Sequence, residues 1–156
     1  MTDLAGRFER QVHILPIRVY YEDTDFSGSV YHANYLKFCE RGRSDCLRLI
    51  GVHHHELQGE ANFVVRRMVC DFLKPATIDN LLAVETRFLE FAGARMELAQ
   101  KVRRDDEVLF EAMVTAALVD GHGRPKRIPP AMKQAFLAHA NWASNTNLTI
   151  NPAFGA

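Results

Sequence analysis

The sequence has no excess of either charge. Lys and Arg together number 19, Asp and Glu also number 19, and the formal net charge at pH 7 is zero. Binding of nucleic acid by charge alone needs a basic excess or a basic stripe. The overall balance therefore argues against a nucleic-acid partner, although it leaves room for a local basic patch that binds a phosphorylated ligand.

Cysteine is scarce, and the three residues, Cys39, Cys46 and Cys70, follow no regular spacing. An odd, irregular set does not form a disulfide framework, and no CxxC pair indicates a zinc site. We expect all three to be small buried hydrophobic side chains in a reducing compartment.

Long apolar runs are missing as well. No stretch approaches the roughly 20 apolar residues of a membrane helix, and the charged N-terminus lacks the apolar core of a signal peptide. We therefore expect a cytoplasmic protein without a transmembrane segment. The length of 156 residues, with 47% apolar and 24% charged residues, predicts a single globular domain over residues 1–156.

Residues 32–50 carry the clearest helical period. Apolar side chains fall on one face of a 3.6-residue repeat at Tyr35, Leu36, Cys39, Cys46, Leu47 and Ile50. Gly42 continues this stripe, and a mid-helix glycine suggests that another backbone approaches closely there. Gly51 stands where a left-handed C-terminal cap is expected.

The rest of the chain indicates mainly strands. We predict strands at 12–21, 61–72, 81–91, 94–104 and 107–119, and a short helix at 130–139. Residues 94–104 are ambiguous, because their composition favours helix while their alternation favours strand. Pro16 argues for an edge position or a bulge.

This order of elements, a strand, one long helix and then four strands in hairpin sequence, predicts an α+β domain. A curved antiparallel sheet that wraps around the central helix would bury the apolar face of the helix. Such a sheet has open edges, and self-association commonly covers them. We therefore expect a homodimer or a homotetramer.

Unusual residue types gather between the first strand and the helix. Asp25 lies in a segment of turn residues (22–29), His32 stands at the helix entrance, and Tyr21 precedes Asp25 by four residues. Free N–H groups at a helix start stabilise negative charge and could hold the oxyanion of an attacked thioester. A nearby carboxylate could attack the carbonyl or take a proton from water. Turn or capping roles are, however, the commoner uses of an Asp and a His in such places.

A resemblance favours the chemical interpretation. The stretch YEDTDFSGSVYHANYLKFCERGRS resembles the signature of the YbgC-type acyl-CoA thioesterases, which belong to the 4-hydroxybenzoyl-CoA thioesterase family and have the hotdog fold. The matching positions are Tyr21, Thr24, Asp25, Gly28, Val30, Tyr31, His32, Ala33, Asn34, Tyr35, Leu36, Phe38 and Glu40. The resemblance extends over about residues 12–130.

The resemblance implies roles for individual residues. Asp25 would be the nucleophile or general base, His32 would position or polarise the substrate, and Tyr21 would hold the aspartate or line the pocket. Tyr31 and Asn34 would contact the substrate at an active site in a subunit interface. The reaction would need no metal and no cofactor beyond the coenzyme A of the acyl-CoA substrate.

Basic residues could meet the phosphates of coenzyme A. The candidates are Arg66, Arg67 and Lys74 around one strand, with Arg124, Lys126 and Arg127 around another. Arg66 and Lys74 are the favoured pair, although exposed charges are common on any surface.

Two other motifs contain residue types that can act in catalysis or bind a metal. Glu40 lies on the helix, where another hotdog subgroup carries its catalytic glutamate, but a structural hydrogen bond or ion pair is the favoured interpretation. His53, His54 and His55 do not have the i, i+4 spacing with which a helix presents two imidazoles to one metal ion. We interpret them as a solvated loop.

The sequence leaves some alternatives open. Ser27 and Ser29 differ from residues common in the family and could alter the loop. Gly42 and Cys46 also differ and would alter helix packing and the shape of the pocket, so the size of the acyl group is not predicted. A hotdog dehydratase or hydratase, which pairs His with a carboxylate on another element, is one rival. A non-catalytic protein that binds acyl thioesters or takes part in protein interactions is the other.

Overall fold

The computed structural model describes residues 4–52 and 61–139. The strands are β1 (Arg7–Glu9), β2 (Val12–Arg18), β3 (Ala61–Phe72), β4 (Leu81–Ala92), β5 (Arg95–Arg104) and β6 (Glu107–Asp120). The helices are α1 (His32–Ile50) and α3 (Pro130–His139), with a 3-10 turn at Tyr21–Asp23.

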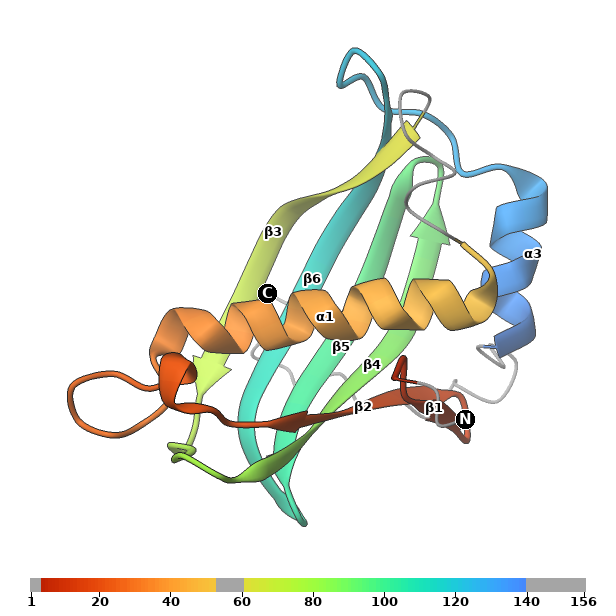
Figure 1. The fold of residues 1–156 in the computed structure, drawn as a ribbon. Coiled ribbons are helices and arrows are strands. Elements are labelled where there is room, and N and C mark those ends of the chain that lie inside the picture. The colour runs from red at the N-terminus through yellow and green to blue at the C-terminus, as the bar shows by residue number, and fades with distance from the viewer. Residues whose placement is uncertain (1–3, 53–60, 140–156) are drawn as a thin grey trace.

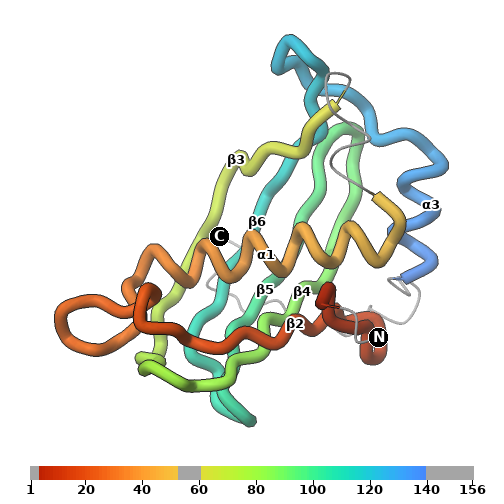
Figure 2. Tube along the Cα trace, viewed as in Figure 1, coloured from red at the N-terminus to blue at the C-terminus, as the bar shows by residue number. Residues whose placement is uncertain are grey.

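The six strands form one antiparallel sheet in the order β1-β2-β4-β5-β6-β3. The sheet curves, and α1 lies across its concave face, while α3 packs at one end (Figure 1). The predicted α+β hotdog architecture, a curved sheet around one long helix, is confirmed. The trace in Figure 2 shows that β3 and β2 run along opposite sides of the molecule, with α1 between them.

The predicted hairpin order of the last four strands is wrong for β3. β4, β5 and β6 follow one another as neighbours, but β3 pairs with β6 and lies at the far edge of the sheet. The chain crosses from β3 to β4 through residues 73–80. Which strands pair depends on how whole faces of the sheet become buried. The local sequence of β3 contains no signal for its pairing with β6.

Helix α1 has the predicted limits. Tyr31 before it is extended, and Gly51 after it has a φ of 98° and donates its N–H to the carbonyl of Arg48. The buried face includes Phe38 and Cys39, both fully buried against the sheet. Periodicity and the glycine cap thus predicted this element correctly, because both signals are local.

Gly42 is required by close packing of α1 on the sheet. A Cβ atom at this position would lie 2.9 Å from Val84 Cγ1 and 3.1 Å from Thr86 Oγ1. The approaching groups are therefore side chains of β4 and β5, not the backbone that the sequence suggested. Gln100 on β5 completes the contact, because its amide donates to the carbonyl of Cys39 and to Thr86 Oγ1, both at 2.9 Å.

The N-terminal hairpin differs from the prediction. β1 was not predicted, and its turn is made by Arg10 and Gln11 with φ values of 48° and 72°, where glycine or asparagine is usual. Pro16 lies beyond the three residues that pair with β1, so it stands at an open edge as predicted. Strand β2 ends at Arg18, before the 3-10 turn.

The prediction that the cysteine side chains are buried is confirmed for two of the three residues. Cys39 and Cys46 are buried, whereas Cys70 is only partly buried, and all three are free. Burial raises the pKa of Cys39 to about 12. The thiols in the core therefore behave as small hydrophobic side chains.

Candidate active site

Asp25 lies in a tight loop directly before α1. Thr24 and Val30 face each other as an isolated antiparallel bridge, and the N–H of Asp25 donates to the carbonyl of Ser29 at 2.8 Å. Gly28 turns the chain with a φ of 86°. The conformation of loop 24–30 therefore depends on this glycine and fixes where Asp25 stands.

The Asp25 carboxylate is exposed and held by one neighbour. Its Oδ1 accepts hydrogen bonds from the backbone N–H of Ser27 at 2.8 Å and from Ser27 Oγ at 2.6 Å. These bonds hold the pKa of Asp25 below its usual value, with a smaller contribution from the charge of His32. The group is therefore ionised at neutral pH, as both a nucleophile and a general base require.

His32 is the first residue of α1 and is exposed. Its ring lies 4.5 Å from the ring of Tyr31 and 6.2 Å from that of Phe72 at the end of β3. Within the described residues, Tyr31 provides no side-chain cap for the helix. The N–H of Asn34 donates to the carbonyl of Tyr31 at 2.8 Å. Among the described residues, the N–H groups of His32 and Ala33 are thus the ones left for water or a ligand, as an oxyanion site needs.

Asp23 is a structural residue of the site that the sequence did not single out. Its buried carboxylate accepts the N–H of Tyr20 at 2.8 Å and the side-chain amide of Asn34 at 3.0 Å. Its carbonyl accepts the N–H of Tyr31 at 2.9 Å. Asp23 therefore fastens the segment before the Asp25 loop to the first turn of α1. A signal was present, since an acidic side chain at the third position of a helical turn often accepts the N–H of the residue before that turn, as Asp23 does for Tyr20.

The loop between β3 and β4 supports the same segment from the other side. The carbonyl of Ala76 accepts the N–H of Val30 at 2.9 Å, and the N–H of Ala76 donates to the hydroxyl of Tyr35 at 3.1 Å. Burial raises the pKa of Tyr35, whose ring stacks on Phe110 at 5.2 Å. The position of loop 24–30 is thus coupled to the core.

The remaining predicted site residues differ in their surroundings. Tyr21 is 83% exposed and Tyr31 is 46% exposed. The hydrogen bonds to the Asp25 carboxylate come from Ser27, not from the Tyr21 phenol. The amide of Asn34 is occupied by Asp23. The structure thus brings Asp25 and His32 together, places Tyr21 and Tyr31 on the exposed surface of the same segment, and buries Asn34 beneath it.

The predicted coenzyme A contacts are distributed over the molecule. Arg66 and Arg67 are exposed on β3, where a bulge interrupts the pairing with β6. Lys74 pairs with Glu107 at 3.0 Å.

The other basic group lies far from the Asp25 loop and His32 within one chain. Arg124, Lys126 and Arg127 are exposed in the loop after β6. This loop lies near Ala61, which pairs with Asp120, whereas Phe72 at the other end of β3 lies near His32. At about 3.3 Å per residue, the twelve residues of β3 separate the two regions by more than 30 Å.

The other candidate motifs are Glu40 and the run of three histidines after α1. Glu40 is exposed and accepts a hydrogen bond from Ser44 Oγ at 2.6 Å. His53, His54 and His55 lie outside the described residues. Across residues 4–52 and 61–139, no three potential metal ligands come together. No helix in these ranges is long and apolar enough to cross a membrane.

Comparisons with known proteins agree with this geometry. The model of the thioesterase-like superfamily matches residues 19–136. The acyl-CoA thioesterase YbgC of Haemophilus influenzae is 42% identical over 124 residues, covering 78% of this chain and 91% of the relative. The acyl-CoA thioester hydrolase YbgC of Escherichia coli O157:H7 is 37% identical over 128 residues, covering 78% of this chain and 92% of the relative.

A solved structure is similar over the same region. The probable thioesterase from Bartonella henselae superimposes with a TM-score of 0.73 at 44% identity, covering 76% of this chain and 99% of that structure. The family match includes the Asp25 loop, α1 and all strands from β3 to β6. The chain therefore belongs to the thioesterase-like superfamily.

Proposed function

We propose that the protein is an acyl-CoA thioesterase, which hydrolyses an acyl-CoA to the free acid and coenzyme A. The observation that carries the proposal is the ionised Asp25 carboxylate, held by Ser27 beside His32 at the uncapped start of α1. The similarity to YbgC thioesterases over most of the chain supports it.

The site can act by two routes. In the first, an Asp25 oxygen attacks the thioester carbonyl, the C–S bond breaks, and coenzyme A leaves as the thiolate. Water then cleaves the resulting anhydride and restores the carboxylate. In the second, Asp25 takes a proton from water as that water attacks the carbonyl, and the proton passes to the leaving sulfur. In both routes the first N–H groups of α1 stabilise the oxyanion, and His32 positions or polarises the carbonyl.

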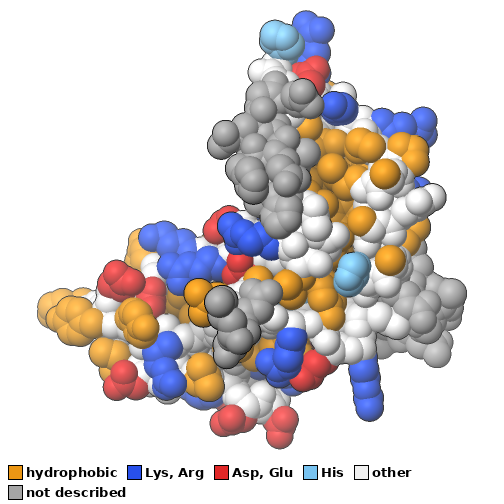
Figure 3. All heavy atoms as spheres, turned by 45° about the vertical axis from the view of Figure 1, so that its right-hand side comes forward, with side chains coloured by type: hydrophobic (Ala, Val, Ile, Leu, Met, Phe, Trp, Pro, Cys, Tyr) orange, Lys and Arg blue, Asp and Glu red, His pale blue; other side chains and the backbone are white. Residues whose placement is uncertain are grey.

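A second copy of the chain completes this site in our proposal. β3 is a twelve-residue edge strand, and Val64 and Val65 on it are exposed. Such an edge readily pairs with another strand. Phe26 and Phe72 are also exposed, and hydrophobic side chains gather at the projecting end of the molecule (Figure 3). A homodimer built through β3, which could pair again into a tetramer, would cover these groups.

The substrate contacts follow from this arrangement. Tyr21 and Tyr31 are exposed beside the catalytic loop and could line the entrance for the pantetheine arm. Arg66 and Lys74 could meet the phosphates of coenzyme A. Asn34 acts through Asp23 and holds the helix start in place. We place the reaction in the cytoplasm, where thiols such as the three free cysteines stay reduced.

Hydrolysis of a panel of acyl-CoAs by the wild type and by Asp25→Asn tests the proposal. We expect the variant to lose about a hundredfold or more, the scale of a lost general base. Asp106→Asn, an exposed carboxylate in the β5–β6 turn, is the matched control and should keep full activity. Equal activity of Asp25→Asn, or an inactive wild type, would contradict the proposal and favour an acyl-thioester-binding protein. Hydration of enoyl-CoA would instead favour the dehydratase.

A further inference from the structure

Arg104, the last residue of β5, connects the β5–β6 hairpin to the loop of residues 73–80 between β3 and β4. Its Nη1 donates to the carbonyl of Pro75 at 3.3 Å and to Asn80 Oδ1 at 2.9 Å. Its Nη2 donates to Glu107 Oε1 at 2.6 Å, at the start of β6. A guanidinium presents its donors as a rigid fork, so this one side chain holds all three acceptors in a fixed arrangement.

Glu107 adds a second attachment to the same loop. Its Oε2 accepts a hydrogen bond from Lys74 Nζ at 3.0 Å. The hydrogen bond from Lys74, and next the one from Arg104, lower the pKa of Glu107, so this carboxylate is ionised at neutral pH. Loop 73–80 is therefore held near both of its ends, by Glu107 at Lys74 and by Arg104 at Asn80.

Asn80 extends these contacts towards Asp25. Its Oδ1 accepts the N–H of Thr77 at 2.9 Å in addition to the guanidinium of Arg104. Thr77 pairs with Ser29 as an isolated antiparallel bridge. The carbonyl of Ser29 accepts the N–H of Asp25 at 2.8 Å. An unbroken series of contacts therefore leads from Arg104 to the backbone of Asp25.

Loop 73–80 depends on such contacts for its shape. Asp79 has a φ of 70°, in the left-handed region that residues other than glycine seldom adopt, although aspartate tolerates it better than most. A conformation of this kind persists where surrounding contacts determine it. Here Arg18 Nη1 donates to the carbonyl of Asp79 at 2.9 Å, and Arg104 holds the neighbouring Asn80. Loss of the Arg104 contacts should therefore loosen the loop.

We propose that Arg104 is a positioning residue for the thioesterase reaction, because it orders loop 73–80 and thereby fixes where the Asp25 carboxylate stands. The inference rests on the proposed function. The side chains of Arg104 and Glu107 are 32% and 38% exposed, and exposed ion pairs contribute little to stability. A displacement of about 1 Å in an active site can nevertheless cost about a hundredfold in rate. Arg104 should therefore matter more for the rate than for the stability of the fold.

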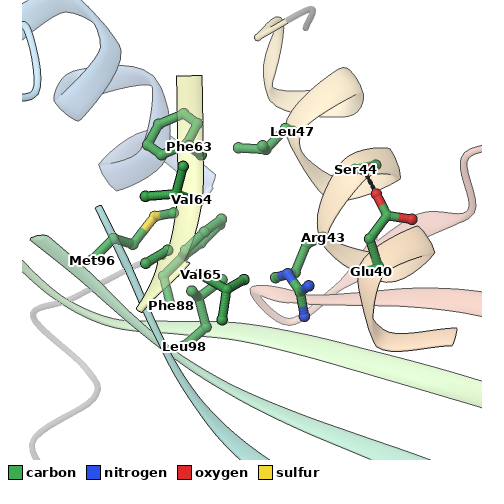
Figure 4. A pocket seen from close by; sticks show the side chains of 11 residues that line it. Glu40, Arg43, Ser44, Leu47, Phe63, Val64, Val65, Phe88, Met96 and Leu98 are labelled. Carbon is green, nitrogen blue, oxygen red and sulfur yellow. Dashed lines mark hydrogen bonds between the residues drawn. The ribbon is translucent and has the colours of Figure 1, made fainter. Parts of the chain in front are cut away.

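The Arg104 contacts lie apart from the cavity of about 150 Å³ between the middle of α1 and the sheet. Glu40, Arg43 and Ser44 line the helix side of this cavity, and Glu40 accepts the Ser44 hydroxyl there (Figure 4). Within the described part of the chain, its lining includes neither Arg104 nor any residue of loop 73–80. A change at Arg104 should therefore leave the shape of this cavity as it is.

Arg104→Gln and Arg103→Gln form a matched pair of variants. The side chain of Arg103 is also 32% exposed and also forms an ion pair at 2.6 Å, but its partner is Glu85 on β4 and not a residue near loop 73–80. We expect Arg104→Gln to lose about tenfold in kcat, below the loss for a full 1 Å displacement. KM should stay within about twofold, because a misplaced carboxylate weakens stabilisation of the transition state alone. Arg103→Gln should keep kcat within about twofold.

Three results of this comparison would overturn the role of Arg104. These are an unchanged kcat in Arg104→Gln, an equal loss in Arg103→Gln, and a rise in KM alone, which would mean that Arg104 acts on substrate binding. Arg104→Lys keeps the charge but reaches fewer acceptors, so its kcat should fall between those of the wild type and Arg104→Gln.

A double-mutant cycle separates positioning from a general loss of structure. If Arg104 acts through Asp25, Arg104→Gln should cause no further loss in an Asp25→Asn background, because the group that it positions is already disabled. A merely structural contribution would lower the activity by the same factor in both backgrounds, and that result would overturn the proposal.

Asn80 provides a second test from the side of the loop, which applies even if Arg104→Gln does not fold. Asn80→Ala removes the acceptor that Arg104 shares with Thr77, and it should also lose about tenfold in kcat. Asn80→Asp keeps an acceptor oxygen in place and should retain most of the activity. Full activity of Asn80→Ala would contradict the series of contacts.

The two proposals fail in distinguishable ways. If the wild type shows no thioesterase activity, or if Asp25→Asn is fully active, the proposed function itself is wrong. If Asp25→Asn loses activity while Arg104→Gln and Asn80→Ala keep it, only the role of Arg104 is wrong. Thermal unfolding of each variant separates these outcomes from loss of the fold.

Discussion

The two halves of the region around α1 are stabilised in opposite ways. The segment from Tyr20 to His32 is largely exposed, and polar contacts to Asp23, Ser27 and Ala76 hold it. The helix from Phe38 onward is instead buried against β4 and β5 through apolar contact and the close approach at Gly42. The difference teaches that changes to exposed side chains of the first half should alter activity with little effect on stability, and that changes to buried side chains of the second half should mainly lower stability.

Phe38→Ala should show the largest effect on stability. Phe38 is fully buried, and truncation of a buried phenylalanine costs about 3–5 kcal/mol of the free energy of unfolding. Urea denaturation measures this loss, and Lys37→Ala at the neighbouring exposed position should stay within about 0.5 kcal/mol of the wild type. A loss below about 1 kcal/mol for Phe38→Ala would show that the second half of α1 does not carry the core.

Asp23→Ala should lower both the stability and the activity of the protein. Removal of the carboxylate leaves the N–H of Tyr20 and the amide of Asn34 without their acceptor, which costs about 1–3 kcal/mol. The segment that carries Asp25 also loses an attachment to α1, so under the proposed mechanism kcat should fall in the fraction that remains folded. Asp23→Asn, which keeps one acceptor oxygen, should recover part of both losses. Full activity of Asp23→Ala would mean that loop 24–30 holds its position alone.

Gly42→Ala should have a smaller effect on stability. Its Cβ would meet Val84 and Thr86 at 2.9 and 3.1 Å, and such overpacking costs about 1–3 kcal/mol. The better helix propensity of alanine returns about 1 kcal/mol, so the net loss should be about 1 kcal/mol in urea denaturation. A variant more stable than the wild type would show that the sheet yields to the added methyl group.

Ser27→Ala should produce the smallest change, seen in the pH dependence of kcat/KM. The proposed mechanism needs the ionised form of Asp25, and the lowered pKa keeps this carboxylate ionised until the pH falls through that lowered value. Loss of the Ser27 hydroxyl should raise the pKa towards its usual value, so the acid limb of the profile should move to higher pH. Ser29→Ala is the control, because only the backbone of Ser29 contacts Asp25. Identical acid limbs for wild type and Ser27→Ala would contradict the role of this bond.

The elements of the fold differ in how well the sequence predicts them. Helix α1 and the turn at Asp25 were predictable, because periodicity, the Gly51 cap and turn residues are signals within a few positions. The β1–β2 hairpin was not, because Arg10 and Gln11 adopt left-handed conformations without the usual residues of such a turn.

The sequence by itself determined the α+β class, the limits of α1 and the turn that carries Asp25, and its resemblance pointed to the thioesterase family. Only the tertiary structure decided that β3 takes the edge next to β6 and that Asp23 fastens the helix start. It also decided that Arg43 meets Gln100, 57 residues away, at the wall of a cavity. The physical reason is that strand order and side-chain partners depend on which distant surfaces bury each other, and no local pattern encodes that choice.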